Sequence, residues 1–345
     1  MRLDRYNGKS FAILMDDETK IGVARRRITR YLDQLGCDSV FVSEVAIIVM
    51  ELSVNLMKHA LGKKMLIFRS TLHHQRQNIE VISIDEGPYI EQLKEALKDG
   101  FSTQGTLGIG LGSVKRLSDK FDYYSVKDMG NVFIAQKYTD KLKPAASTHK
   151  NFDFLCAPVE GVHECGDDIA IDMLTESGMR LMMTDGMGHG ERAQDSCTLA
   201  REVFFQHPEM SLKEVIKTID HKIKDIRGLD MLLMDIVEEG GRAMVNCAAV
   251  GNISVYKVDI GGREVARHVP NPGKVGYQIY NVKEASYSLA QGEVLIAHTD
   301  GMLPLKGFCS KLLGLPSTVI ASSCFLKSSI PSDDSSIFVY KNATS

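Results

Sequence analysis

In the first half of the chain, apolar residues recur at helical spacing over 21–36 and 44–61. Each stretch ends at a glycine, and Ser43 precedes the second stretch as a candidate N-cap. Further helices are expected at 89–100 and 113–121. Shorter apolar runs predict strands, which lie at 11–17, 64–72, 78–85 and 131–138. Helices packed on one face of a mixed sheet form a two-layer α/β sandwich, which is the fold expected for this half.

The second half of the chain has a different pattern, in which many short strands are interrupted by helices at 191–207 and 212–226. The expected strands lie at 167–174, 179–185, 231–239, 242–250, 253–259, 293–300 and 335–341. Several of them end in aspartate. This half is therefore expected to form a second α/β domain whose strand ends carry acidic groups.

The stretch 139–150 separates the two halves. It is rich in small and polar residues and contains one proline, a composition typical of a linker. We expect a first domain over 1–140, a linker over 141–151 and a second domain over 152–345.

Composition excludes several classes of function. The net charge of −3 over 345 residues gives no electrostatic basis for binding nucleic acid or an anionic membrane. The N-terminus has no signal peptide, and no apolar run approaches the roughly 18 residues that span a bilayer. The seven cysteines form no CxxC pair, so neither a disulfide scaffold nor a zinc site is expected. A cytoplasmic protein with neither a nucleic-acid nor a membrane partner is predicted.

A cluster of glycines is the most informative local feature of the sequence. Gly105, Gly108, Gly110 and Gly112 precede an expected helix. Glycines at this position let the backbone approach a ligand, and the free N–H groups at a helix start favour phosphate. Surface turns also carry glycines, so the cluster alone is a weak signal for phosphate binding.

Two further polar patterns lie upstream of the glycines. Glu51, Asn55 and His59 follow one another at four-residue spacing, which places them on one face of an otherwise apolar helix. Asp85 and Gly87 lie at the end of an expected strand. A polar stripe on an apolar helix indicates that the stripe faces a cleft.

Together these blocks resemble the nucleotide-binding boxes of the Bergerat-type ATPase family, and the resemblance covers roughly residues 8 to 139. The segment DGFSTQGTLGIGLGSVKRLSDKF, residues 99–121, resembles the phosphate lid of the RsbT switch serine kinases. These kinases phosphorylate STAS-domain proteins of the bacterial stressosome. The resemblance implies ATP and Mg²⁺ as cofactors and a STAS-domain partner.

The resemblance also implies a role for each matched residue. Glu51 would be the general base toward the attacking hydroxyl, and Asn55 would coordinate the magnesium ion. Asp85 would accept a hydrogen bond from the adenine amino group, and Gly87 would leave room for the ring. The backbone that wraps the phosphates would be that of Gly108, Gly110 and Leu111.

The sequence departs from the ATPase pattern at two positions. Tyr89 replaces the second glycine of the adenine box, so its ring could crowd the nucleotide or stack on it. Asn131 replaces a threonine whose hydroxyl supports adenine recognition, and its amide could substitute as a hydrogen-bonding group.

Acidic residues next to glycine recur at strand ends in the second half. They are Asp167 and Asp168, Asp185, Asp300, and Asp333 and Asp334. An Asp-Gly pair is also a common turn, but four such clusters favour a site for hard divalent cations bound through oxygen.

The segments CGDDIAI, MTDGMGHGERAQDS, AVGNI, AHTDGM and SDDSSIF resemble metal-dependent type 2C serine/threonine phosphatases, in particular the SpoIIE and RsbX branch. The match covers roughly residues 152 to 341 and implies an α/β/β/α sandwich. It implies two Mn²⁺ or Mg²⁺ ions, with water as the attacking group. The implied ligands are Asp167, Asp185 bridging both ions, the Gly186 carbonyl, Asp300 and Asp333, with Asp334 as a second choice for the last.

The two resemblances together predict a bifunctional partner-switching regulator that phosphorylates a STAS-domain protein and then removes the phosphate. In the alternative, the first domain is a regulatory module that binds ATP or a protein and gates the phosphatase. A third reading is an anti-sigma factor. The presence of Glu51 and Asn55 favours catalysis, whereas Tyr89 and Asn131 favour the module. A homodimer remains open.

Overall fold

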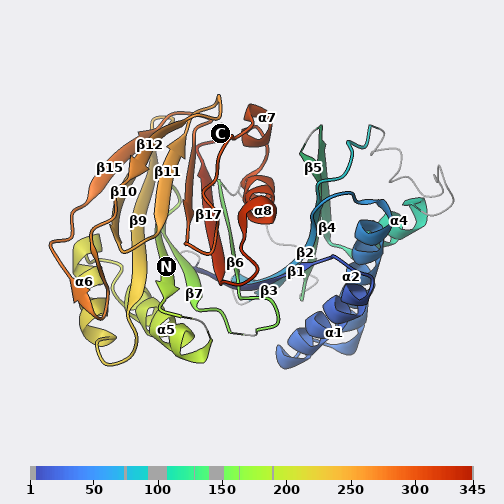
Figure 1. The fold of residues 1–345 in the computed structure, drawn as a ribbon, viewed down its shortest axis with the longest axis horizontal. Coiled ribbons are helices and arrows are strands. Elements are labelled where there is room, and N and C mark those ends of the chain that lie inside the picture. The colour runs from blue at the N-terminus through green and yellow to red at the C-terminus, as the bar shows by residue number, and fades with distance from the viewer. Residues whose placement is uncertain are drawn as a thin grey trace. The chain divides into compact units, whose positions relative to one another are not determined.

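The computed structural model describes residues 5–73, 76–91, 107–127, 129–139, 151–162, 164–188 and 190–343. It divides into two compact units (Figure 1). The first unit is Ser10–Thr148, and the second unit combines Met1–Lys9 with His149–Ser345. The N-terminal residues therefore count with the second unit, and most of the expected linker lies outside the described residues.

The first unit is built on an antiparallel sheet in the order β1-β2-β3-β5-β4. Its strands are β1 (Arg5–Leu14), β2 (Lys64–His73), β3 (Arg76–Asp85), β4 (Lys120–Val126) and β5 (Gly130–Tyr138). The predicted pairing of β2 with β3 is confirmed. Strand β4 was not predicted, and it lies at the edge of the sheet beside β5.

Among the residues that the structure describes, three helices accompany this sheet: α1 (Thr19–Gln34), α2 (Ser39–His59) and α4 (Leu107–Leu117). Helices α1 and α2 pack side by side on one face of the sheet (Figure 1). Apolar residues of both helices and of the sheet form a common core, which includes Ile28, Leu52, Leu56, Phe68 and Val81. The two-layer α/β sandwich is confirmed.

Helix α2 begins five residues earlier than predicted, because Asp38 and not Ser43 is its N-cap. Asp38 Oδ1 accepts hydrogen bonds from the backbone N–H groups of Val40 at 2.9 Å and Phe41 at 3.0 Å. Ser43 lies inside the helix, and its hydroxyl donates to the carbonyl of Ser39 at 2.7 Å. Two bonds from one carboxylate fix the first turn more strongly than a hydroxyl would.

The glycine cluster also differs from its prediction. Gly108, Gly110 and Gly112 lie inside α4 and not in a loop before it, and the helix ends at Leu117. Packing of Leu111 and Val114 into the core outweighs the low helix propensity of the glycines. Gly105 and the helix expected at 89–100 lie outside the described residues, apart from the first three positions of that range.

Among the described residues, α2 is long and apolar enough to cross a membrane by length and composition, with a mean hydropathy of 1.9. The sequence prediction considered only uninterrupted apolar runs, whereas this helix is apolar on average with polar residues interspersed. Leu52 and Leu56 on its inner face pack against the sheet of the first unit. Its apolar character is therefore that of a core helix.

The second unit contains two stacked sheets. One has the order β15-β10-β9-β8-β7, and residues 5–7 of β1 pair with β7. Its strands are β7 (Asp167–Thr175), β8 (Gly178–Gly186), β9 (Leu229–Glu239), β10 (Arg242–Val250) and β15 (Ala285–Leu289). The other has the order β12-β11-β16-β17-β6, with strands β6 (Phe152–Ala157), β11 (Ser254–Val258), β12 (Glu264–His268), β16 (Val294–His298) and β17 (Ser335–Lys341). A short ribbon of β13 (Gly273–Lys274) and β14 (Gln278–Ile279) adds to these.

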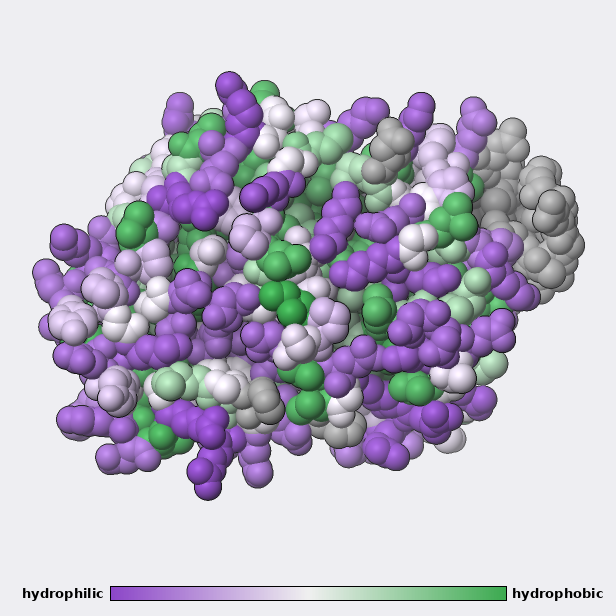
Figure 2. Space-filling view, viewed as in Figure 1, coloured by the Kyte–Doolittle hydropathy of each residue, from purple (hydrophilic) through white to green (hydrophobic). Residues whose placement is uncertain are grey.

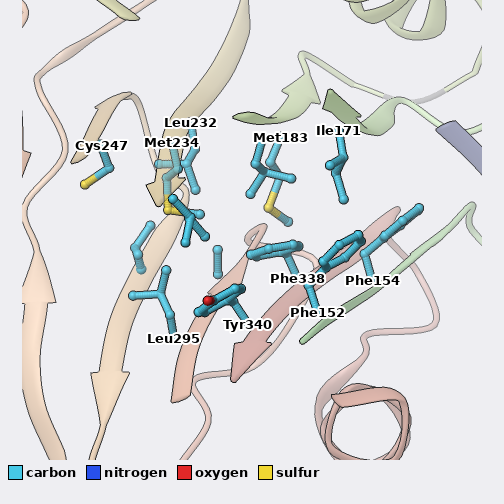
Figure 3. Close-up of a cluster of buried hydrophobic side chains, with 14 of the residues drawn as sticks. Phe152, Phe154, Ile171, Met183, Leu232, Met234, Cys247, Leu295, Phe338 and Tyr340 are labelled. Carbon is cyan, nitrogen blue, oxygen red and sulfur yellow. The ribbon is translucent and has the colours of Figure 1, made fainter. Parts of the chain in front are cut away.

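Helices cover the outer faces of both sheets (Figure 1). Helices α5 (Glu191–Gln206) and α6 (Leu212–Lys222) pack on the first sheet, and α8 (Ser317–Ser328) packs on β6 and β17, preceded by α7 (Ser310–Leu313). Between the sheets lies a core to which Met183, Leu232, Phe338 and Tyr340 contribute (Figure 3). The predicted α/β/β/α sandwich is confirmed, although β6, β12, β15 and α8 were not predicted.

The surface seen in Figure 2 is mostly hydrophilic, with apolar side chains scattered across it. This distribution agrees with the apolar residues being used mainly in the cores of the two units.

Candidate functional site

The polar stripe of α2 lies against the glycine-containing part of α4. Glu51 and Asn55 are one turn apart and both are half-buried. A Cβ atom added at Gly110 would lie 2.5 Å from Glu51 Oε2 and 3.9 Å from Asn55 Oδ1. A larger residue at this position would therefore displace the Glu51 carboxylate. The structure thus brings together three of the residues that the sequence nominated for one site.

Asn55 has a hydrogen-bonding atom without a partner. Its Nδ2 is buried and makes no hydrogen bond within the described part of the chain. Leaving a buried amide donor unsatisfied costs roughly 1–3 kcal/mol. A ligand carrying oxygen acceptors, such as a phosphate, would recover this cost. The side chain therefore fits a phosphate or metal–phosphate group, which is what the family resemblance requires.

The other nominated residues near this pair have different positions. Gly108 is the second residue of α4. The Leu111 side chain is only 2% exposed and belongs to the core, so only its backbone is left for a phosphate. His59 is exposed at the last position of α2.

Asp85 ends β3 in a buried position, 5% exposed. Its Oδ1 accepts hydrogen bonds from the Gly87 N–H at 2.6 Å and from Asn131 Nδ2 at 2.9 Å. Burial raises the pKa of Asp85, while these two hydrogen bonds and the charge of Lys64 oppose the rise. The two hydrogen bonds fix the orientation of the carboxyl group and engage Oδ1, so Oδ2 is the atom to consider for a ligand.

Asn131 stands where the family pattern has a threonine, and its side chain makes structural hydrogen bonds at this position. Besides binding Asp85, its Nδ2 donates to the Pro88 carbonyl at 3.2 Å, and its Oδ1 accepts from the Ser125 hydroxyl at 2.6 Å. The amide therefore ties β5 to the loop after β3. Tyr89 on this loop is 50% exposed, so its side chain does not fill a buried cavity.

A second cluster of charged groups lies where three strands of the second unit meet. The ladder between β7 and β8 places Asp167 opposite Asp185, and the ladder between β8 and β9 places Asp185 opposite Asp230. Burial raises the pKa of Asp167 to about 8, and the charges of Asp334 and Asp333 add to the rise. Burial also raises the pKa of Asp185 to about 9, together with the charges of Asp167 and Asp300.

Such raised pKa values arise because the carboxyl groups are buried, and because like charges lie near them without enough positive charge. A divalent cation would supply this charge, so the donor set fits a magnesium- or manganese-type site. Among the described residues, no three Asp, Glu, His or Cys side chains are already grouped as a complete set of ligands. Backbone carbonyls and water would have to supply the remaining ligands, as is usual for magnesium.

The two acidic residues of the SDDSS segment have separate environments. The Asp334 carboxylate is buried and accepts hydrogen bonds from the Val159 N–H at 2.9 Å and the Gly166 N–H at 2.7 Å. Asp333 is exposed, as is Asp300 on the loop after β16. Asp334 therefore has a structural role that occupies both of its oxygens, which leaves Asp333 as the better candidate ligand.

Close packing fixes the position of Gly186, and an ion pair fixes the side chain of Asp168. A Cβ atom at Gly186 would lie 2.9 Å from the carbonyl oxygens of Ala193 and Gly166, so only glycine fits there. Asp168 forms an ion pair with Arg201 of α5 at 2.6 Å. The alternation of β7 directs Asp168 toward α5 and Asp167 away from it.

Sequence reasoning missed Asp230, which is 3% exposed and lies 3.1 Å from Lys274 Nζ. Burial raises the pKa of Asp230, and the charge of Asp300 raises it further, whereas Lys274 opposes the rise. Arg227 was also missed, and its guanidinium donates to the Met187 carbonyl on the loop after β8 at 2.9 Å. Asp230 was overlooked because the strand was expected to begin at residue 231, and cross-strand register is not visible in the sequence.

The position of Asp230 depends on Gly251. A Cβ atom at Gly251 would lie 1.9 Å from Asp230 Oδ1, whereas Gly161, with a similar positive φ, has open space around it. Gly161→Ala should cost only the strain of a left-handed alanine, about 1–2 kcal/mol. Gly251→Ala should cost clearly more, because it also displaces a buried carboxylate. Thermal unfolding of the two variants measures the difference, and equal losses would contradict this packing.

Comparisons with known proteins agree with this geometry. The model of the histidine kinase-like ATPase domain matches residues 14–137, and the model of stage II sporulation protein E (SpoIIE) matches residues 175–310. Over 117 residues the chain is 33% identical to the serine/threonine-protein kinase RsbT of Bacillus subtilis (strain 168), covering 34% of this chain and 87% of RsbT.

Two solved structures are similar in fold to parts of the chain. A structure of RsbX in complex with magnesium has 20% identity and a TM-score of 0.47, covering 55% of this chain and 92% of that one. The phosphatase domain with a regulatory fragment of SpoIIE from Bacillus subtilis has 16% identity and a TM-score of 0.42, covering 76% and 79% of the two chains.

The chain thus joins two domains, in which an ATPase domain of the histidine-kinase type precedes a serine/threonine phosphatase domain. It belongs to the family of the serine/threonine-protein kinase RsbT through its first unit, and its second unit is a phosphatase domain of the SpoIIE type. Such a pair of domains is that of a partner-switching regulator. Enzymes of these two types use ATP and metal ions, respectively.

Proposed function

We propose that the chain phosphorylates a serine or threonine of a STAS-domain partner with MgATP and hydrolyses the same phosphoester in its second unit. The observation that carries the kinase half is the approach of Gly110 to Glu51 and Asn55. The observation that carries the phosphatase half is the alignment of Asp167 with Asp185 at adjacent strand ends. Identity to RsbT supports the STAS-domain partner.

In the kinase half, Asn55 would hold Mg²⁺, and the backbone of α4 at Gly108 and Gly110 would bind the phosphates. Glu51 would accept the proton of the attacking hydroxyl. When bound, the magnesium ion would neutralise charge on the phosphates. The close contact between Gly110 and Glu51 supports this assignment, because transfer to a hydroxyl requires the base to lie near the phosphates.

Asp85 would recognise the adenine. Its Oδ1 already accepts hydrogen bonds from Gly87 and Asn131. A carboxyl group whose orientation is fixed before binding loses little entropy when it accepts a hydrogen bond from the adenine amino group. The half-exposed Tyr89 lies four residues further along and is free to stack on the ring. These contacts support ATP binding despite the two departures from the family pattern.

ATP with magnesium should raise the melting temperature, because a ligand that binds only the folded state stabilises it. Asp85→Asn should reduce this shift, since the charged acceptor for the adenine amine is lost. Asp33→Asn on the exposed surface of α1 is the matched control and should respond like the unmodified protein. Calorimetry that detects no ATP binding to the unmodified protein at millimolar concentration would overturn the nucleotide site.

In the phosphatase half, Asp167, Asp185, Asp300, Asp333 and the Gly186 carbonyl would hold two Mn²⁺ or Mg²⁺ ions. When bound, the ions would lower the pKa of water and neutralise charge on the phosphoryl oxygens. The position of Asp185 between Asp167 and Asp230 in the sheet supports its assignment as a ligand shared by both ions.

Positive charge for the substrate comes from the chain itself. Lys274 and Arg227 border the acidic cluster, through the contact of Lys274 with Asp230 and of Arg227 with the Met187 carbonyl. We assign them to orienting the phosphoryl group of the substrate. Arg227→Ala is then expected to raise KM more than it lowers kcat.

The cycle operates in the cytoplasm, where ATP is available and thiols stay reduced. All seven cysteines are free, which supports this compartment. A STAS-domain protein mixed with the chain and labelled ATP should gain label, and should lose it when manganese is added. Failure to label any STAS-domain protein would contradict the proposed partner.

A further inference from the structure

Three cysteines surround the backbone that precedes the metal ligand Asp167. Cys156 lies on β6 and Cys165 lies two residues before Asp167, and their sulfur atoms are 3.6 Å apart. Cys156 Sγ also contacts the Asp167 carbonyl at 3.4 Å. Cys197 Sγ of α5 donates to the Gly166 carbonyl at 3.0 Å. None of the three is in a disulfide.

We propose that Cys156 and Cys165 form a reversible disulfide when the protein meets a hydroperoxide, and that this disulfide disables the acidic centre. The disulfide itself does not depend on the proposed function, whereas its effect on metal binding does. The two sulfurs are already in contact, so closing the bond of about 2.05 Å requires an approach of roughly 1.5 Å.

The chemistry needs only the hydroperoxide as oxidant. The sulfur of Cys165 attacks the peroxide oxygen, the O–O bond breaks, and water or an alcohol leaves as a sulfenic acid forms on Cys165. The sulfur of Cys156 then attacks that sulfenic sulfur, the S–S bond forms, and a second water leaves. Cys165 is half-buried whereas Cys156 is only 6% exposed, so the oxidant reaches Cys165 first.

The second step joins two sulfur atoms that are already in contact, so it is fast once the sulfenic acid exists.

Formation of the disulfide would affect the metal ligands by displacing Gly166. Its N–H donates to Asp334 Oδ2 at 2.7 Å, and its carbonyl accepts from the Gly186 N–H at 3.0 Å. Cys156 is held in the sheet by pairing of β6 with β17, so Cys165 in its loop has more freedom to move. Displacing Cys165 shifts Gly166 and strains the strand ends that carry Asp167 and Asp185.

The packing around Gly166 leaves no space for this displacement. A Cβ atom added there would lie 2.8 Å from Asp334 Oδ2, 3.0 Å from the Gly188 carbonyl and 3.1 Å from the Ala193 Cβ. A displacement of more than about 1 Å must therefore move at least one of these neighbours, because packed interiors do not deform freely. Two of them, Gly188 and Ala193, follow the candidate ligand Gly186 on the loop and helix after β8.

The test treats the full chain with hydrogen peroxide, alkylates the remaining thiols and maps the peptides by mass spectrometry. A peptide pair joined through Cys156 and Cys165 is expected, and dithiothreitol should remove it. Cys165→Ser should give no such pair. Cys309→Ser, which removes another half-buried thiol of the same unit, is the matched control and should still form it. Absence of the joined peptides in the unmodified protein would overturn the proposal.

Calorimetric titration with Mn²⁺ measures the consequence. The oxidised protein should bind manganese about 10–100-fold more weakly than the reduced protein, the effect typical of disturbing the groups that support metal ligands. Cys165→Ser should keep its affinity after peroxide. An unchanged affinity in protein that carries the disulfide would overturn the coupling. If the reduced protein bound no manganese, the proposed metal site would fail, while the peptide map would still decide on the disulfide.

Discussion

Asp185→Asn is expected to abolish the metal-dependent hydrolysis of phosphate esters. Asp185 lies between Asp167 and Asp230 on adjacent strands, and burial together with the charges of Asp167 and Asp300 raises its pKa to about 9. Removing a residue that only supports a metal ligand typically costs 10–100-fold in activity, so removing a bridging ligand should cost well over 100-fold. An aryl phosphate assay with excess manganese measures the loss, which added metal should not restore.

The same substitution should leave the fold intact. Asparagine has the shape of aspartate, and a carboxyl group with a raised pKa is largely neutral at pH 7 in the metal-free protein. The melting temperature without metal at pH 7 is thus expected to rise, because folding no longer has to protonate a carboxyl group that is charged in the unfolded chain. Asp195→Asn, on the exposed surface of α5, is a control that should keep full activity. Near-normal turnover by Asp185→Asn would refute the two-metal site.

Glu51→Ala should still bind ATP but lose phosphorylation of the partner by roughly 10²–10⁴-fold, the usual contribution of a general base. A general base acts in the transition state and contributes little to nucleotide affinity. The experiment must use the Asp185→Asn background, since an active phosphatase would erase the product and imitate a dead kinase. Phosphatase activity should persist in Glu51→Ala alone, because its ligands lie in the second unit.

The Glu51 experiment also separates the two functions that the sequence left open for the first unit. If the phosphatase-dead protein transfers no phosphate while ATP changes the phosphatase rate of the active protein, the unit is a regulatory module. If that protein transfers phosphate and Glu51→Ala stops the transfer, the unit is a kinase.

The sequence predicted the residues whose neighbours along the chain reveal their role. Asp167 and Asp185 could be nominated because each adjoins a glycine at the end of an apolar strand. Glu51 and Asn55 could be nominated because they interrupt an apolar helix at a spacing of one turn. The same kind of local pattern predicted most strands and helices of both units, because the spacing of apolar residues shows which face of a strand or helix is buried.

Features that depend on tertiary packing were not predictable in the same way. Asp230 became visible only through its register with Asp185, and the contact of Gly110 with Glu51 only through the packing of α4 on α2. The glycines of α4 have low helix propensity, so a loop was the natural prediction. Asp38 and Ser43 both lie near the start of α2, and both residue types are favoured at the N-cap. N-cap propensity therefore does not show which of them begins the helix.

A pulse-chase measurement tests the central claim, that one chain both adds and removes the same phosphate. A STAS-domain protein is incubated with the chain and labelled MgATP, ATP is then removed, and manganese is added. The label should enter the partner, and it should leave as inorganic phosphate with the unmodified chain but stay with Asp185→Asn. The account would be contradicted if the Asp185→Asn protein, which binds ATP but cannot erase product, left the partner unlabelled.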